Sequence, residues 1–295
     1  MPEILRVGLL GCGLMGSGIA QAAATAGFST LVRDVEDGLL ARGEDAIQRS
    51  LGKLVEKGKL DPVSSRRALE RLTFTTELGA LAECDLIIEA ITEDLGLKNE
   101  LWRALDDLSP AETIFASNTS SLSIGAMAAA TRRPDRFVGL HFFNPVPLMP
   151  LVEVVRAVTT SPEVFERAMG FARRLGKEPI AARDRSGFVV NRLLVPFLLD
   201  AVRALDQGVA SAADIDRGMH LGCGHPMGPL LLLDFVGLDT VNRIAEIMFD
   251  EYREARYAPP PLLRRLVAAG FHGRKSGRGF YDYASDPPAP IDPGL

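Results

Sequence analysis

A glycine-rich turn near the start of the chain constrains its fold more than any other feature. It lies in the sequence Val7-Gly-Leu-Leu-Gly-Cys-Gly-Leu-Met-Gly16, where an apolar strand pattern passes directly into a helical one. Such a turn presents backbone N–H groups at the positive end of a helix, where a pyrophosphate can bind. We expect Gly11 to permit the tight turn, Gly13 to let phosphates approach, and Gly16 to allow close packing of helix and strand.

An acidic residue follows the second apolar stretch. Asp34 directly follows residues 29–33 and lies roughly twenty residues beyond the glycines, which is the spacing expected of a carboxylate that binds a ribose. The turn and the acid together favour a dinucleotide-binding fold over an ordinary βα turn with a surface aspartate.

Apolar stretches rich in Val, Ile and Leu alternate with helical patterns in the first part of the chain. Their nearly continuous hydrophobicity is typical of strands in a sheet covered on both faces. We expect strands over residues 5–10, 29–33, 85–91, 113–117, 137–142 and 151–156 and helices over 16–26, 37–57 and 96–108. This alternation predicts an α/β fold with a Rossmann-type, doubly wound sheet. The excess of helix between Asp34 and Phe74 predicts a helical-hairpin insertion.

Beyond residue 185 the strand patterns give way to helical ones. Helical spacing covers 187–208, 211–221, 228–253 and 260–270. We therefore expect a Rossmann-like domain over 1–185 and an all-helical C-terminal domain over 186–295. The proline-rich residues from Tyr281 onward are expected to form a frayed tail.

The composition excludes several classes of function. With 47% hydrophobic and 24% charged residues, the chain reads as soluble and globular. A net charge of -5 argues against nucleic-acid binding, and no apolar run approaches the ~20 residues that cross a bilayer. The three cysteines lack metal-ligand spacing, so no metal site is expected. Without an apparent secretory signal, we expect a cytoplasmic location.

His141 is the best candidate for a general base among the four histidines. It ends the expected strand 137–142, where ligands of open α/β sheets bind. Glu153 lies in the next apolar run, where a carboxylate needs a partner. The intervening prolines favour a reversal that brings Glu153 beside the imidazole, fixing its tautomer and raising its basicity. A structural histidine with an unrelated glutamate remains open on the residues alone.

Polar residues follow the expected strand 113–117, in the sequence Ser117-Asn-Thr-Ser-Ser121. One or two of them would cap the next helix, and the others predict a pocket floor that binds a substrate oxygen or a nicotinamide amide. Asn191 either solvates a helix face or reaches into an interdomain cleft. The basic residues of the hairpin form either a solvated face or a phosphate contact.

Taken together, these residues resemble the L-3-hydroxyacyl-CoA dehydrogenase family in its short bacterial form. The resemblance covers nearly the whole chain, and its motifs occur in the family's order and spacing. They are Glu89-Ala-Ile-Thr-Glu93, Ser117-Asn-Thr-Ser-Ser-Leu122, His141-Phe-Phe-Asn-Pro145, Gly187-Phe-Val-Val-Asn-Arg192 and Pro226-Met-Gly-Pro229. The family oxidises the 3-hydroxyl of an acyl-CoA thioester and passes the hydride to NAD.

The resemblance also implies roles for individual residues. His141 is the base with Glu153 as its partner, while Ser120 and Asn191 bind and position the substrate. Besides the glycines and Asp34, the dinucleotide contacts are Glu93, Lys98, Asn144 and Lys275, and the coenzyme A contacts are Ser50, Lys57 and Ser120. The helical domain is implied to form a homodimer. Arg33 departs from the family pattern, which leaves the preference for NAD over NADP open.

We therefore expect reversible NAD-dependent oxidation of a short-chain (S)-3-hydroxyacyl-CoA, 3-hydroxybutyryl-CoA, to the 3-oxoacyl-CoA. Related dehydrogenases use the same machinery on 3-hydroxyadipyl-CoA, on a hydroxyacyl group bound to a carrier protein, or on a sugar acid such as gulonate. Dehydrogenases of the 6-phosphogluconate type share the domain order but use a catalytic lysine. A non-catalytic dinucleotide-binding protein would have lost part of the catalytic set, which is complete here.

Overall fold

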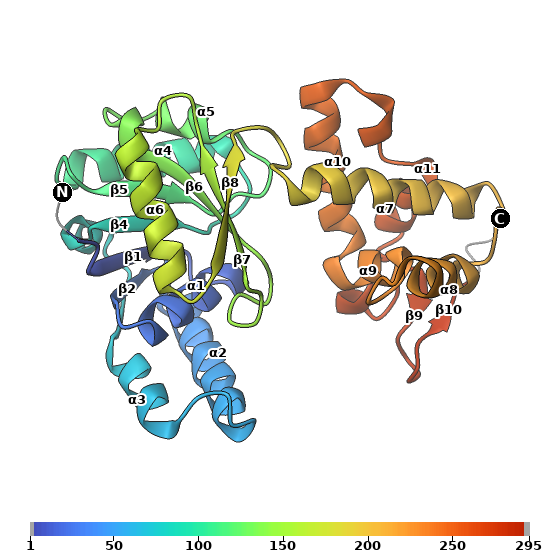
Figure 1. The fold of residues 1–295 in the computed structure, drawn as a ribbon, viewed down its shortest axis with the longest axis horizontal. Coiled ribbons are helices and arrows are strands. Elements are labelled where there is room, and N and C mark those ends of the chain that lie inside the picture. Colours follow the sequence, from blue (N-terminus) through green and yellow to red (C-terminus); the bar gives the residue numbers. More distant parts are fainter. Residues whose placement is uncertain (1–2, 292–295) are drawn as a thin grey trace. The chain divides into compact units, whose positions relative to one another are not determined.

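The computed structural model describes residues 3–291, and the contacts divide the chain into two compact units (Figure 1). The first unit ends at Phe188 and the second begins at Val189. The sequence placed the domain boundary between residues 185 and 186, a short distance before this point.

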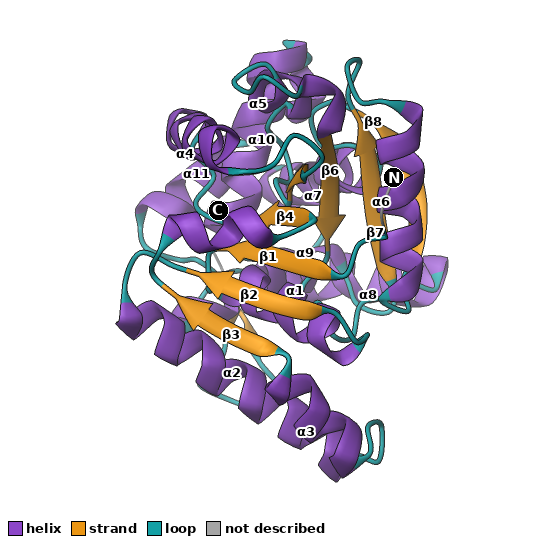
Figure 2. Cartoon of the chain, turned by 90° about the vertical axis from the view of Figure 1, so that its left-hand side faces the viewer, coloured by secondary structure: helices purple, strands orange, loops and turns teal. Residues whose placement is uncertain are grey.

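The first unit is built on an eight-stranded sheet (Figure 2). Its strands lie in the order β3-β2-β1-β4-β5-β6-β7-β8. They are β1 (Arg6–Leu10), β2 (Ser29–Arg33), β3 (Leu72–Thr75), β4 (Leu86–Glu89), β5 (Ile114–Ser117), β6 (Phe137–Phe142), β7 (Leu151–Arg156) and β8 (Glu178–Arg183). All neighbours are parallel except β6 and β7, which are antiparallel. The carboxyl ends of β1 to β6 therefore share one edge with the amino end of β7.

Helices cover both faces of this sheet, which confirms the doubly wound fold. One core contains residues of α1 (Leu14–Thr25), α2 (Asp37–Glu56), α3 (Pro62–Glu70) and α6 (Pro162–Arg174). The other contains residues of η1 (Leu78–Glu83), α4 (Leu95–Leu108) and α5 (Ile124–Ala128). Side chains alternate between the two cores: Leu9 packs in the first and Leu10 in the second, both fully buried. The helices α2 and α3 form the predicted insertion.

Two strands at the outer edges, β3 and β8, lack the apolar run on which strand prediction depends. Their sequences are Leu-Thr-Phe-Thr and Glu-Pro-Ile-Ala-Ala-Arg, and most of their side chains are only partly buried or exposed. An edge strand has one neighbour and less cover than a central strand, so polar residues are tolerated there.

The second unit is helical, as expected. Its helices are α7 (Val190–Asp206), α8 (Ala212–Cys223), α9 (Pro229–Val236), α10 (Leu238–Tyr252) and α11 (Pro261–Ala268). The segment 228–253, expected to be helical, contains two helices, because Gly237 adopts a φ of +104° that ends α9 before α10 begins. Leu230, Leu233 and Leu263 are fully buried in its core.

The expectation of a frayed tail is wrong for the part that the structure describes. The short strands β9 (Tyr281–Asp282) and β10 (Ala289–Pro290) pair in an antiparallel ladder. The N–H groups of Phe280 and Tyr281 donate to the buried carboxylate of Asp234 at 2.8 and 2.9 Å. This side-chain acceptor orders the segment, and apolar content alone did not indicate it. Residues 292–295 of the expected tail lie outside the described residues.

Candidate active site

The glycine-rich turn joins the carboxyl end of β1 to the start of α1. Gly11 has a φ of +93°, and a Cβ on Gly16 would lie 1.8 Å from the Gly11 carbonyl oxygen. At Gly13, by contrast, no atom lies within 4 Å of the position that a Cβ would take, and this residue gives α1 no side-chain cap. The turn therefore leaves open space before an uncapped helix N-terminus, which fits a phosphate group.

Asp34 lies beside this turn at the end of β2. Its Oδ2 accepts the N–H of Cys12 at 2.6 Å, so the half-buried carboxylate is held next to the glycines. Burial, together with the charge of Asp34, raises the pKa of the Cys12 thiol to about 11, which keeps the sulfur neutral. The Arg33 Nε donates to the Thr76 carbonyl oxygen at 3.1 Å. The uncapped helix, the open space and the adjacent acid together fit a dinucleotide.

His141 and Glu153 are brought together by strand register. They are direct partners in the antiparallel pair β6–β7, so their side chains share one face of the sheet. The His141 Nδ1 lies 2.6 Å from the Glu153 Oε2. Glu153 is fully buried and His141 is 6% exposed. A carboxylate at this distance holds the ring proton on Nδ1 and leaves Nε2 as the proton acceptor.

Asn118 connects this pair to the neighbouring strand. It follows β5, and its Oδ1 accepts the N–H of Phe142 at 2.9 Å. The contact fixes the end of β6 against the polar segment after β5. Ser120 lies in that segment, half buried, and its hydroxyl has no hydrogen-bond partner within residues 3–291.

The buried Lys98 forms ion pairs with two carboxylates near the same segment. Lys98 is 1% exposed, and its Nζ lies 2.5 Å from the Glu89 Oε1 and 3.2 Å from the Glu93 Oε2. Glu89 also accepts the hydroxyl of Ser117 at 2.6 Å. The sequence motif contained Glu89, but its role was not predicted. A carboxylate that ends the fully buried strand Leu-Ile-Ile-Glu was the signal for it.

Glu93 connects Lys98 to the polar segment that follows β5. It accepts the hydroxyl of Thr119 and the N–H of Ser120, the latter at 3.1 Å. Burial alone would raise the pKa of the Glu93 carboxyl, but the charge of Lys98 and the Thr119 hydroxyl outweigh it and hold that pKa below its usual value. Glu93 is therefore ionised at neutral pH. Because Lys98 is itself buried between carboxylates, its direct contact with a dinucleotide stays a prediction.

The remaining predicted residues occupy more open positions. Asn144 is exposed in the connection after β6. Ser50 is half buried on α2, and Lys57 is exposed where α2 ends. In the second unit, Asn191 is half buried in the first turn of α7, and the exposed Lys275 lies 2.7 Å from Asp239. Their roles stay predictions.

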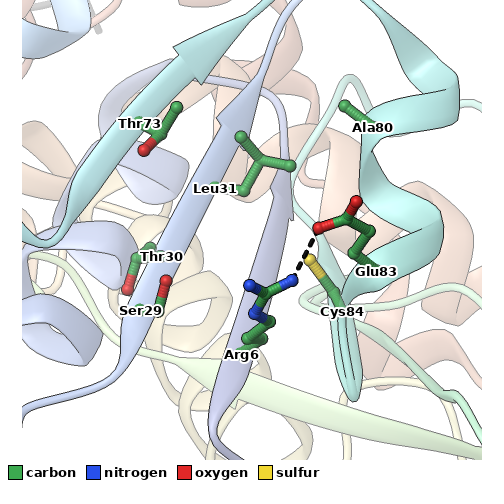
Figure 3. A pocket seen from close by; sticks show the side chains of 8 residues that line it. All are labelled: Arg6, Ser29, Thr30, Leu31, Thr73, Ala80, Glu83 and Cys84. Carbon is green, nitrogen blue, oxygen red and sulfur yellow. Dashed lines mark hydrogen bonds and ion pairs between the residues drawn. The ribbon is translucent and has the colours of Figure 1, made fainter.

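A pocket of about 190 Å³ lies near the amino ends of β1 and β2, away from the sheet edge that bears the glycine-rich turn (Figure 3). Arg6 and Glu83, which line it, form an ion pair at 2.6 Å. Burial raises the pKa of the neighbouring Cys84 thiol to about 12, so the sulfur stays protonated. This pocket therefore offers neither a thiolate nor an unpaired charge. In the part of the chain that the structure describes, no group of acidic, histidine and cysteine side chains is arranged to hold a metal ion.

Comparisons with known proteins cover nearly the whole chain. Residues 6–185 match the family described as 3-hydroxyacyl-CoA dehydrogenase, NAD binding domain, and residues 187–283 match its C-terminal domain. The chain is 49% identical over 282 residues to the 3-hydroxybutyryl-CoA dehydrogenase of Mycobacterium tuberculosis, covering 95% of this chain and 99% of that one.

Two crystal structures are similarly close. FadB2 of M. tuberculosis superposes with a TM-score of 0.94 at 49% identity, covering 96% of this chain and all of the other (100%). The (S)-3-hydroxybutyryl-CoA dehydrogenase PaaH1 of Ralstonia eutropha superposes with a TM-score of 0.92 at 43% identity, with coverage of 96% and 100%.

Proposed function

Because the chain belongs to the 3-hydroxyacyl-CoA dehydrogenase family, we propose that it interconverts (S)-3-hydroxybutyryl-CoA and acetoacetyl-CoA. The observation that carries this proposal is the 2.6 Å contact between His141 and Glu153 at the edge of the sheet that also bears the glycine-rich turn. The names of the relatives at 49% and 43% identity support a short acyl chain.

His141 is the general base of this reaction. Its Nε2 takes the proton of the 3-hydroxyl as hydride leaves C3, and bound NAD supplies the hydride acceptor. Glu153, bonded to Nδ1, stabilises the imidazolium that forms and fixes the orientation of the ring. Proton transfer to a positioned side chain contributes typically ~10²–10⁴-fold to the rate. In the reverse direction the imidazolium returns the proton to the ketone oxygen.

Ser120 binds the oxygen of the substrate on which His141 acts. Its hydroxyl is without a partner within residues 3–291, and the Glu93 carboxylate fixes its backbone. By resemblance to the family, Asn191 also binds and positions the substrate. Asp34 binds the adenosine ribose, while Asn144 and Lys275 complete the dinucleotide contacts.

The helical hairpin binds coenzyme A. Ser50 lies near the end of α2, and Lys57 is the residue that follows its last turn. The hairpin also presents the exposed cations Lys53, Lys59, Arg66 and Arg67. Such a group of cations suits the phosphates of coenzyme A, which a free sugar acid lacks.

A homodimer through the helical unit and a cytoplasmic location belong to the same proposal. Phe235 and Leu193 are 47% and 71% exposed, although neighbouring leucines form the core. Large exposed apolar side chains recur in this unit, also at Val209 and Leu221, and a contiguous patch of such side chains marks an interaction surface. The cysteines of the chain are free thiols, which fits a reducing compartment. Sedimentation of the parent and of Phe235→Glu tests the dimer, which a monomeric parent would exclude.

A steady-state assay of the reduction of acetoacetyl-CoA by NADH tests the activity directly. The kcat/KM is then compared across longer 3-oxoacyl-CoA thioesters, 3-oxoadipyl-CoA, acetoacetyl groups on a carrier protein, and the oxidation of gulonate. We expect the highest kcat/KM with acetoacetyl-CoA. A higher value with another member of this panel would assign the enzyme to that substrate.

A further inference from the structure

Phe188 has an unusual backbone conformation for an aromatic residue. Its φ is +47°, and within the described residues only Arg253, at +53°, shares this sign without being glycine. Bulky L side chains rarely adopt such values, so the surrounding structure must impose them. Strain of this kind is commonly retained where it serves a site.

Four hydrogen bonds hold the turn that contains Phe188. The N–H of Phe188 donates to the Arg185 carbonyl oxygen at 2.8 Å. The Ser186 hydroxyl donates to the Ser121 carbonyl oxygen at 3.1 Å. The carboxylate of Asp184 accepts two backbone N–H groups at the start of α5, at 2.9 and 2.7 Å. The turn is thus fastened to the polar segment that follows β5.

The ring of Phe188 packs on the imidazole of His141. It is 4% exposed, and the two ring centroids lie 5.6 Å apart with the planes tilted by 59°. Phe143 also packs on the imidazole, at 4.6 Å, and Glu153 on β7 is the titratable group bonded to it. The imidazole therefore has two aromatic neighbours beside its carboxylate partner.

We propose that Phe188 is a positioning residue for His141, with the strained turn holding its ring against the imidazole. The ring restricts rotation of the imidazole and keeps water from it. The proposal rests on the proposed role of His141 as the base. Replacing the aromatic ring with water changes the solvation of the imidazolium that forms during turnover.

The test compares Phe188→Ala with Phe188→Gly in the full-length enzyme. Both variants lose the ring, but only glycine relieves the backbone. We expect kcat to fall about tenfold or more in both with acetoacetyl-CoA and NADH, because small misplacements of a catalytic group are costly. KM should change little, and the pH profile of kcat/KM should differ from that of the parent. Phe188→Gly should melt at a higher temperature than Phe188→Ala.

Arg253→Gly is the matched control for strain, since it relieves the other positive φ at the exposed end of α10. It should raise the melting temperature and leave kcat unchanged. A loss of activity in Phe188→Ala that follows the folded fraction, with the parental pH profile, would show a purely structural role and overturn the inference. Parental kcat in Phe188→Ala beside an inactive His141→Gln would overturn this inference alone. Parental turnover in His141→Gln would instead overturn the proposed function.

Discussion

Glutamine in place of Glu153 tests the buried contact between His141 and its carboxylate partner. The substitution keeps the shape of the side chain and removes its charge. Glu153 is fully buried and His141 is 6% exposed, so water cannot take over the lost interaction. A hydrogen bond to a charged group contributes about 1.5–3 kcal/mol. Because the imidazolium develops in the transition state, we expect that loss to lower kcat by about 10–150-fold.

Turnover of acetoacetyl-CoA, followed through the absorbance of NADH, measures this effect. The KM for acetoacetyl-CoA and the Kd for NADH should change little, because the glutamate contacts the base and neither ligand. Glu178→Gln makes the same chemical change at an exposed position of β8 and should keep parental kcat. A Glu153→Gln enzyme within about twofold of the parent would refute the reasoning.

Three further outcomes follow from the contacts described. Asp34→Ser should weaken the binding of NAD and improve the kcat/KM for NADPH, because the carboxylate repels a 2′-phosphate. An unchanged cofactor preference would contradict the role of Asp34 in binding the ribose. Gly16→Ala should destabilise the protein by about 1–3 kcal/mol in denaturant unfolding, since its Cβ would lie 1.8 Å from the Gly11 carbonyl oxygen. Gly52→Ala should not destabilise the protein, because a Cβ on Gly52 would meet open space. An equal loss of stability in the two variants would argue against the close packing at Gly16. Burial raises the pKa of Asp234 from 3.8 to about 6. The folded state therefore binds this proton more tightly, and the group adds up to about 3 kcal/mol to the free energy of unfolding as the pH falls from about 7 to 4. Thermal unfolding of Asp234→Asn should show a weaker dependence of stability on pH in this range. A pH dependence equal to that of the parent would exclude the contribution of Asp234.

The fold was predictable where local pattern and global structure agree. The central strands are continuous apolar runs because helices cover both faces, so β1, β2 and β6 lie where the sequence placed them. The edge strands β3 and β8 are less covered, and their sequences therefore lack the continuous apolar run that indicates a strand. The break at Gly237 within a helical pattern depends on a backbone angle that the residue type permits but does not require.

The site was predictable to a similar extent. The prolines between β6 and β7 indicated a reversal, and the register that makes His141 and Glu153 partners follows from it. The contacts of Lys98 with Glu89 and Glu93 join different elements, so spacing along the chain does not reveal them. The φ of Phe188 has no sequence signal, because non-glycine residues normally avoid it.

His141→Gln tests the role of the imidazole most directly. The measurement pairs kcat for acetoacetyl-CoA reduction with the Kd for NADH, obtained by fluorescence titration of the same preparation. The proposed role predicts a fall in kcat of about 10²–10⁴-fold with an unchanged Kd. Parental turnover in this variant would contradict the assignment of the base.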